Sequence, residues 1–194
     1  IMFIGGGRVF AQAQLGSDID GEAAGDQSGV RVAMDSDGSH VAIAAYGNDG
    51  SADNAGHVRV YEYSGSSWSQ VGNDIDGEAD GDRSGYGMGV AIDSDGSHVV
   101  IGAMLNDGTG TDAGHVRVYE RDASNTTIAP FGWSQLGSDI DGEADGDRSG
   151  YAVAMDSDGS HVAIGAYRND GTGTDAGHVR VYEYSGSSWS QVGN

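Results

Sequence analysis

The densest group of residues that could do chemistry is the string DIDGEADGDRSG at 139–150. Carboxylates occupy alternate positions in it, at Asp139, Asp141, Glu143, Asp145 and Asp147. From Asp141 onward, carboxylates stand at the first, third and fifth places and Gly at the sixth. Calcium loops begin in this way, because alternate side chains converge on one hard ion and Gly permits the bend. The string therefore predicts a divalent cation site, although the twelfth place, where an EF-hand has its bidentate Glu, is Ala152.

Nearly the same string occurs twice more, which extends the set of candidate metal ligands. The second copy supplies Asp74, Asp76, Glu78, Asp80 and Asp82. The first copy supplies Asp18, Asp20, Glu22 and Asp26, with Ala24 at the fifth place of the loop, where the other copies have Asp80 and Asp145. Two like charges about 6 Å apart at an effective dielectric near 20 repel by roughly 3 kcal/mol. Two interpretations remain open: Ca²⁺ or another divalent ion bridges the carboxylates, or the loop is simply hydrated, with Arg83 or Arg148 as a local partner.

Internal repetition organises the whole chain. DIDGEA, DSDGSHV and AGHVRVYE each occur three times, and counting from Gln14, Gln70, Gln135 and Gln191 gives units of 56, 65 and 56 residues. The middle unit is longer mainly because RDASNTTIAPFG, at 121–132, replaces a short turn. The predicted boundaries are therefore 14–69, 70–134 with the insertion 121–132, and 135–194. Residues 1–13 are either the end of a preceding unit or a leader, because Ala11–Ala13 faintly matches a signal-peptide cleavage pattern.

The third unit shows how each repeat should fold. Residues 151–155 and 161–166 are short apolar runs separated by the turn string DSDG, which predicts a hairpin. HVRVYEY at 178–184 alternates apolar and polar residues, and WSQVG at 189–193 follows another turn. Four short antiparallel strands per repeat, without helical periodicity, favour an all-β fold of β-propeller blades over a β-solenoid, whose repeats are shorter. We expect three full blades and a partial N-terminal unit.

These strings resemble the FG-GAP repeat family, whose members include the β-propeller of integrin α subunits. Gly150-Tyr151 and Gly165-Ala166-Tyr167 stand where that family has its Phe-Gly and Gly-Ala-Pro strings, and the resemblance covers about 14–194. The resemblance implies a fold built of β-propeller blades and a function in adhesion or ligand binding. The family's calcium loop lies between the first two strands of a blade. Here that hairpin is shortened to MDSDGSH, so Asp156 and Asp158 are interpreted as turn-forming residues.

Composition limits the partners. There are 9 basic residues, all of them Arg, against 30 acidic residues, which gives a formal charge of −21. Such a chain repels nucleic acid and anionic membranes. It has no Cys, so disulfides and thiolate metal sites are excluded, and no apolar run is long enough for membrane insertion. The acidity is typical of salty or calcium-rich surroundings and favours an extracellular or cell-surface protein.

The remaining candidates have mainly structural interpretations. Two histidines per unit are predicted to pack or to form hydrogen bonds at strand ends, since equivalent positions in adjacent blades are too far apart to share a metal. The tryptophans Trp68, Trp133 and Trp189 are predicted to pack on outer strands. No nucleophile or phosphate-binding motif occurs, and the acidic residues recur in every unit, whereas catalysis needs a singular constellation. The insertion 121–132 is the best candidate for specific recognition.

The sequence therefore predicts a non-enzymatic β-propeller module for adhesion or for binding a protein or carbohydrate ligand, with Ca²⁺ as the candidate cofactor. The alternative is a secreted polysaccharide hydrolase or lyase that uses a propeller face. Three blades cannot close a ring, so we expect a homodimer that completes one or a part of a longer chain.

Overall fold

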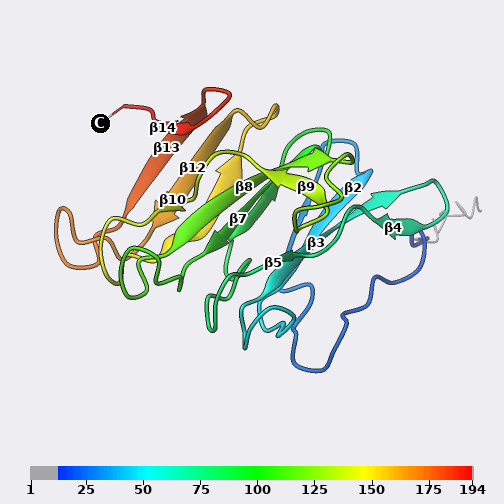
Figure 1. Ribbon diagram of the computed structural model, residues 1–194, viewed down its shortest axis with the longest axis horizontal. Coiled ribbons are helices and arrows are strands. Elements are labelled where there is room, and N and C mark those ends of the chain that lie inside the picture. Colours follow the sequence, from blue (N-terminus) through cyan, green and yellow to red (C-terminus); the bar gives the residue numbers. More distant parts are fainter. Residues whose placement is uncertain (1–12, 194) are drawn as a thin grey trace, which may run out of the picture.

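Three antiparallel sheets make up the computed structural model, which describes residues 13–193 (Figure 1). The first sheet contains β1 (Arg31–Met34), β2 (His40–Ala45), β3 (His57–Tyr63) and β4 (Trp68–Gln70). The second contains β6 (Val90–Ile92), β7 (His98–Ala103), β8 (His115–Asp122) and β9 (Gly132–Gln135). The third contains β11 (Ser149–Met155), β12 (His161–Ala166), β13 (His178–Tyr184) and β14 (Trp189–Gln191). The prediction of an all-β fold with four antiparallel strands per repeat is confirmed.

The four strands named for each sheet pair in chain order, so the connections among these four are hairpins. The repeats use the same register: His40 lies opposite Glu62, and His98 lies opposite Glu120. The turn between the first two strands has a glycine with positive φ, such as Gly96 at 78°. Glycine adopts this left-handed conformation without the strain that a Cβ brings, so the DSDG string folds as the predicted tight turn.

The acidic string is not wholly a loop between blades, as its polarity had suggested. Its Ile-Asp pairs form the short strands β5 (Ile75–Asp76) and β10 (Ile140–Asp141), which pair with β3 and β8 and extend the outer edges of the first and second sheets. Ile75 and Ile140 are buried. Burial of these isoleucines accounts for the difference, because an isoleucine between two aspartates gains more from an apolar core than from a solvated loop.

The sheets lie face to face, running from blue and cyan for the first through green to yellow and red for the third (Figure 1). Their inner strands β1, β6 and β11 are neighbours, and Met88 forms a parallel bridge with Ala152. Small residues permit this approach. A Cβ on Gly102 would lie 2.0 Å from the carbonyl oxygen of Gly150, so any side chain there would push two sheets apart. This crowding explains the repeated small residues on the first two strands of the sheets.

Two apolar clusters join the sheets. The first joins the first and second sheets, and it packs Ala42, Ala44, Val58 and Val60 against Val99, Ile101, Tyr119 and Trp133. The second joins the second and third sheets, and it packs Val100, Val116 and Val118 against Val162, Ile164 and Tyr182. The outer tryptophans also link successive segments, because Trp133 Nε1 donates to the carbonyl of Val71 at 2.9 Å. Outer-strand packing of the tryptophans is therefore confirmed.

Main-chain hydrogen bonds join the hairpin turns of successive sheets. Ser36 donates its backbone N–H to the carbonyl of Ser94 at 3.2 Å, and Ser94 donates in the same way to Ser157 at 3.2 Å. The Ser36 hydroxyl adds a second bond of 2.7 Å to the same carbonyl. We call this end of the stack the hairpin end, and the opposite end, where β3, β8 and β13 begin, the loop end.

The third sheet leaves one face uncovered. Val58 and Val116 are 0% exposed, whereas their counterpart Val179 is 67% exposed. The described residues thus form an open stack rather than a closed ring. Most of the predicted leader or partial unit at 1–13 lies outside the described residues. No helix among the described residues is long and apolar enough to cross a membrane.

Candidate functional site

The last carboxylate of each acidic string is locked into its turn. Asp82 is 2% exposed, and its Oδ2 accepts hydrogen bonds from the Ala79 backbone N–H at 3.1 Å and from Asn106 Nδ2 at 3.0 Å. Asp26 and Asp147 make the equivalent bonds. These hydrogen bonds occupy the Oδ2 atoms, so these three predicted ligands hold the turn in shape.

The other predicted ligands separate into distinct environments. Asp18, Asp74 and Asp139 each accept a hydrogen bond from the glutamine four residues earlier, as at 2.6 Å between Gln70 Nε2 and Asp74 Oδ1. Asp80 accepts the backbone N–H of Asp53 at 3.1 Å, and Asp145 is exposed. The backbone carbonyls of Asp20, Asp76 and Asp141 accept from arginines of the third strands.

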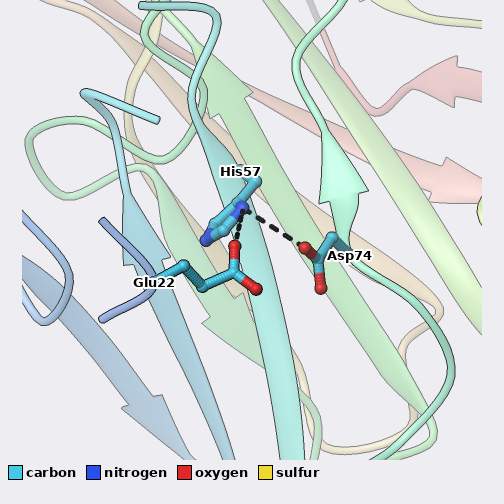
Figure 2. A group of neighbouring side chains, drawn as sticks. All are labelled: Glu22, His57 and Asp74. Atoms are coloured by element: carbon cyan, nitrogen blue, oxygen red, sulfur yellow. Dashed lines mark ion pairs between the residues drawn. The ribbon is translucent and has the colours of Figure 1, made fainter. Parts of the chain in front are cut away.

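At the loop end the glutamate of each string meets the first histidine of a third strand (Figure 2). His57 Nδ1 lies 3.8 Å from Glu22 Oε2 and 3.6 Å from Asp74 Oδ2. His115 Nδ1 repeats this arrangement, 3.7 Å from both Glu78 Oε2 and Asp139 Oδ2. The acidic strings therefore converge on buried histidines, which sequence reasoning had assigned only to packing or hydrogen bonding.

An arginine from the same third strand holds each glutamate. Arg117 Nη2 donates to the Asp76 carbonyl at 2.7 Å, and its Nη1 lies 3.4 Å from Glu78 Oε1. The guanidinium also lies 5.7 Å from the ring centroid of Tyr119, within cation–π range. Arg59 and Arg180 repeat these contacts. The local partners of the acidic string are thus these three arginines. The predicted partners Arg83 and Arg148 instead contact the rings or hydroxyls of Tyr46 and Tyr167.

Burial dominates the electrostatics of this region. It raises the pKa of Asp76, with a further increase from the neighbouring Asp74 carboxylate, and it raises the pKa of Glu78. Burial, together with the Arg117 cation, lowers the pKa of His115 to about 4, so its imidazole is neutral at pH 7. Burial also raises the pKa of Tyr119 to about 12. Partly desolvated carboxylates of this kind gain from a bound cation.

A cleft of about 670 Å³ runs from this region along the junction of the first and second sheets. On one side it is lined by Asp74, Asp76, Glu78, Arg117 and Tyr119. On the other side it is lined by the insertion, from Asp122 to Pro130, with Ser134 and Gln135 of β9 at the edge. The insertion is held by Asn125, whose Nδ2 donates to the carbonyl of Trp133. The segment that occurs only once therefore faces the carboxylates that recur in every unit.

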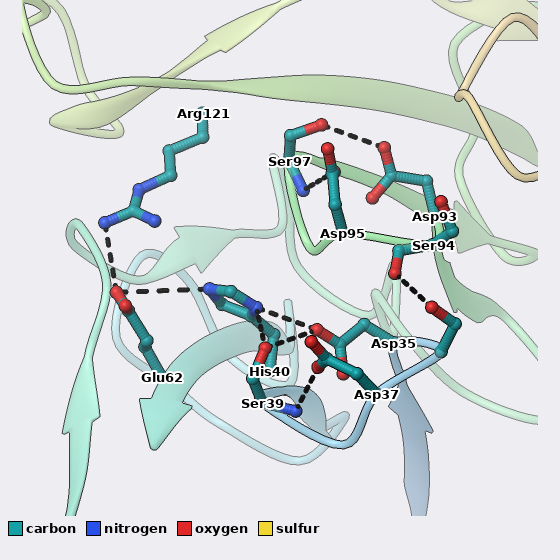
Figure 3. Close-up of polar contacts among 11 residues, drawn as sticks. Asp35, Asp37, Ser39, His40, Glu62, Asp93, Ser94, Asp95, Ser97 and Arg121 are labelled. Carbon is teal, nitrogen blue, oxygen red and sulfur yellow. Dashed lines mark hydrogen bonds and ion pairs between the residues drawn. The ribbon is translucent and has the colours of Figure 1, made fainter. Parts of the chain in front are cut away.

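The hairpin end carries a different set of histidines (Figure 3). His40 Nδ1 lies 2.9 Å from Asp35 Oδ2, and the Ser39 hydroxyl donates to the same oxygen at 2.8 Å. His98 and His161 repeat this network. Serine, histidine and aspartate meet here, but the serine shares Nδ1 and the carboxylate instead of reaching Nε2, as a nucleophile would. The prediction of hydrogen bonding is confirmed for these three histidines.

Comparisons with known proteins show likeness in fold. No protein-family model matches the chain, and no curated protein matches it. Among solved structures it is similar to a putative 6-phosphogluconolactonase from Bacteroides uniformis, with a TM-score of 0.52 and 10% identity, over 83% of this chain and 38% of that one. The tricorn protease matches with a TM-score of 0.42 and 13% identity, over 78% of this chain and 13% of that protein.

The chain thus spans less than half the length of either structure. Taken with the stacked four-stranded sheets, the lactonase likeness shows a partial, open β-propeller fold, and at this identity it shows the fold alone.

Proposed function

We propose that the protein is a non-enzymatic β-propeller module for adhesion or ligand binding at the cell surface, and that the cleft between its first two sheets holds the ligand. The supporting observation is that this cleft is bordered both by the acidic string and by residues between 122 and 130 of the insertion. Repeated residues can build a scaffold, but selective binding needs a surface that occurs once. FG-GAP-like repeats, which the sequence resembles, are consistent with this role.

The chemistry of the cleft favours a ligand with cationic groups or many hydroxyls. Asp74, Asp76 and Glu78 offer carboxylates on one wall, and Ser124 and Asn125 offer hydrogen bonds on the other. Ile128, which is 72% exposed, adds an apolar contact at the rim. A basic peptide segment or a carbohydrate would find both charge and hydrogen-bond complementarity here. Calcium remains the proposed cofactor, because it could link the cleft carboxylates to carbohydrate hydroxyls.

Binding to defined probes tests this proposal. The full chain would be screened on a glycan array and titrated with a fluorescent oligolysine peptide, in Ca²⁺ and in chelator. Asp76→Asn should weaken binding at least about 10-fold, the equivalent of about 1.4 kcal/mol. The matched control is Asp141→Asn, which changes the equivalent residue at a junction without the insertion. Equal effects of the two substitutions would place the ligand elsewhere.

Two further measurements separate the remaining outcomes. Calorimetric titration with Ca²⁺ should give heat, and the melting temperature should rise with Ca²⁺ and fall with chelator; no heat and no shift would remove calcium from the proposal. Activity on a polysaccharide panel that Asp76→Asn abolishes would instead support the hydrolase or lyase and overturn the non-enzymatic assignment.

A further inference from the structure

His57 is a buried polar side chain that lacks the contacts such a group normally has. It is 1% exposed, and neither ring nitrogen has a hydrogen-bond partner among the described residues. Its Nδ1 points between Glu22 and Asp74 (Figure 2). The distances of 3.8 and 3.6 Å exceed the 2.7–3.2 Å of an N–H···O hydrogen bond. A buried nitrogen aimed at two carboxylates without bonding to either needs another partner.

The separations match those of atoms that share a metal ion. Two ligands each about 2.1 Å from a tetrahedral Zn²⁺ lie about 3.4 Å from each other. In both Glu22–His57–Asp74 and Glu78–His115–Asp139, the three ligating atoms lie within 4.8 Å of one another. We propose that each of these two clusters binds a divalent transition-metal ion such as Zn²⁺, with one imidazole and two carboxylates as ligands.

The ligand types favour a transition metal over calcium. Ca²⁺ takes six to eight oxygen ligands, whereas imidazole nitrogen suits Zn²⁺, Co²⁺, Ni²⁺ and Cu²⁺. The site therefore differs in kind from the all-oxygen calcium loop that the spacing of the acidic string predicts.

The neighbouring arginine orients the glutamate so that one carboxylate oxygen can bind the metal ion. Arg59 Nη1 lies 3.6 Å from Glu22 Oε1, while the other oxygen, Oε2, faces His57. One carboxylate oxygen thus meets the guanidinium and the other remains available to the ion. The guanidinium repels a bound cation, but two carboxylates and one arginine still leave each cluster with a net negative charge. Outer contacts of this kind commonly orient metal ligands.

The third repeat provides an internal control. His178 Nδ1 lies 3.7 Å from Glu143 Oε2, and Arg180 Nη1 lies 3.6 Å from Glu143 Oε1. The part of the chain that the structure describes brings no third carboxylate to this pair. Two ligands chelate a metal much more weakly than three, so two sites per chain are expected rather than three. Asp74 and Glu78 also line the cleft, so the titrations below use metal alone, without a cleft ligand.

Titration of the chelator-stripped full chain tests the inference. Calorimetry with Zn²⁺ alone should give two ions per chain, bound more tightly than about 10 µM, and Ca²⁺ should not compete at similar concentrations. Co²⁺ should give visible ligand-field absorption. His57→Gln and His115→Gln should each remove one site and part of the Co²⁺ spectrum, whereas His178→Gln should leave both sites intact.

Further variants protect the test against misfolding. If a buried histidine variant does not fold, as judged by circular dichroism, Asp74→Asn and Asp139→Asn replace half-buried carboxylates with a group of the same size. Each should weaken one Zn²⁺ site at least about 10-fold. The inference is overturned if Zn²⁺ does not bind, if its binding survives loss of both His57 and His115, or if His178→Gln is as harmful as the other variants.

Discussion

The two ends of the stack use the same residue types in opposite ways. At the hairpin end, His98 lies 2.6 Å from Asp93 and shares it with the Ser97 hydroxyl. At the loop end, His115 lies 3.7 Å from both Glu78 and Asp139. In the first arrangement the histidine Nδ1 lies within hydrogen-bond distance of a carboxylate, and in the second it does not. Histidines near carboxylates therefore have different roles, and the distances between their atoms distinguish a structural network from a binding site.

The largest expected effect comes from disturbing the packing on the hydrogen-bonded network at the hairpin end. A Cβ on Gly96 would lie 2.3 Å from His40 Cγ, and Gly96 has φ of 78°. Gly96→Ala should therefore lower the free energy of unfolding by about 3 kcal/mol or more, through overlap and backbone strain together. Gly65→Ala is the matched control, because Gly65 has φ of 88° and nothing within 4 Å of an added Cβ. Urea unfolding measures both, and equal losses would show that the packing on His40 does not matter.

Removing one carboxylate from each end should give unequal losses. Asp93 has a side chain that is 2% exposed and accepts bonds from Ser97 and His98, so Asp93→Ala should cost about 1–3 kcal/mol. Glu78 has a side chain that is 45% exposed, so Glu78→Ala should change the stability of metal-free protein by no more than about 0.5 kcal/mol. Thermal melts in chelator would compare them. A larger loss from Glu78→Ala would reverse the roles assigned to the two ends.

Acid should weaken the two ends in different pH ranges. Because burial lowers the pKa of His115 from 6.5 to about 4, the unfolded state binds more protons between these values, and metal-free protein loses stability as the pH falls through this range. At pH 5.5 the loss is about 1 kcal/mol.

Asp35 should respond only at lower pH. Burial raises its pKa, but hydrogen bonds from His40 and Ser39 outweigh burial and leave the pKa lowered, so its contribution is lost only below about pH 4. Unfolding at pH 7, 5.5 and 3.5 checks both ranges. His115→Gln should flatten the upper range and Asp35→Asn the lower one; the reverse pattern would contradict the assignments.

The smallest effect is expected where the hairpin end meets solvent. Arg121 Nη2 lies 3.2 Å from Glu62 Oε2, which is itself 3.9 Å from His40 Nε2. Both charged side chains are more than 40% exposed. Arg121→Ala should therefore change stability by less than about 0.5 kcal/mol. Chemical denaturation in low and high salt would detect it, and a loss comparable to that of Asp93→Ala would show that His40 depends on this outer pair.

Much of the fold could be predicted because its signals are local. A strand or a turn is specified without reference to distant residues by each of three features: the apolar run at 161–166, the glycine of the DSDG turn and the alternation in HVRVYEY. The strands β5 and β10 were not predicted, since their aspartates resemble a loop, and only the outer edge of the preceding sheet shows why Ile75 and Ile140 are buried.

Less of the candidate site could be predicted from the sequence. The acidic string identified Glu22, Glu78, Asp74 and Asp139 as candidate ligands, but spacing alone grouped them with Asp82, whose Oδ2 the turn occupies. His57 and His115 were assigned to packing or hydrogen bonding, because nothing along the chain connects them with the acids. The recurrence of GHVR together with the acidic string in every unit was the available signal. It could not show that side chains from two successive acidic strings meet at one histidine.

The serine bonds between successive hairpin turns have a consequence for how such a chain can change in length. Ser36, Ser94 and Ser157 join neighbouring sheets through backbone groups, which every amino acid other than proline supplies in full. These main-chain bonds therefore do not depend on which side chains a unit carries, provided that the turn glycine packed on the preceding histidine is kept. A gene segment encoding one unit could be duplicated or deleted while its neighbours dock as before, so the number of blades can vary before their individual surfaces do.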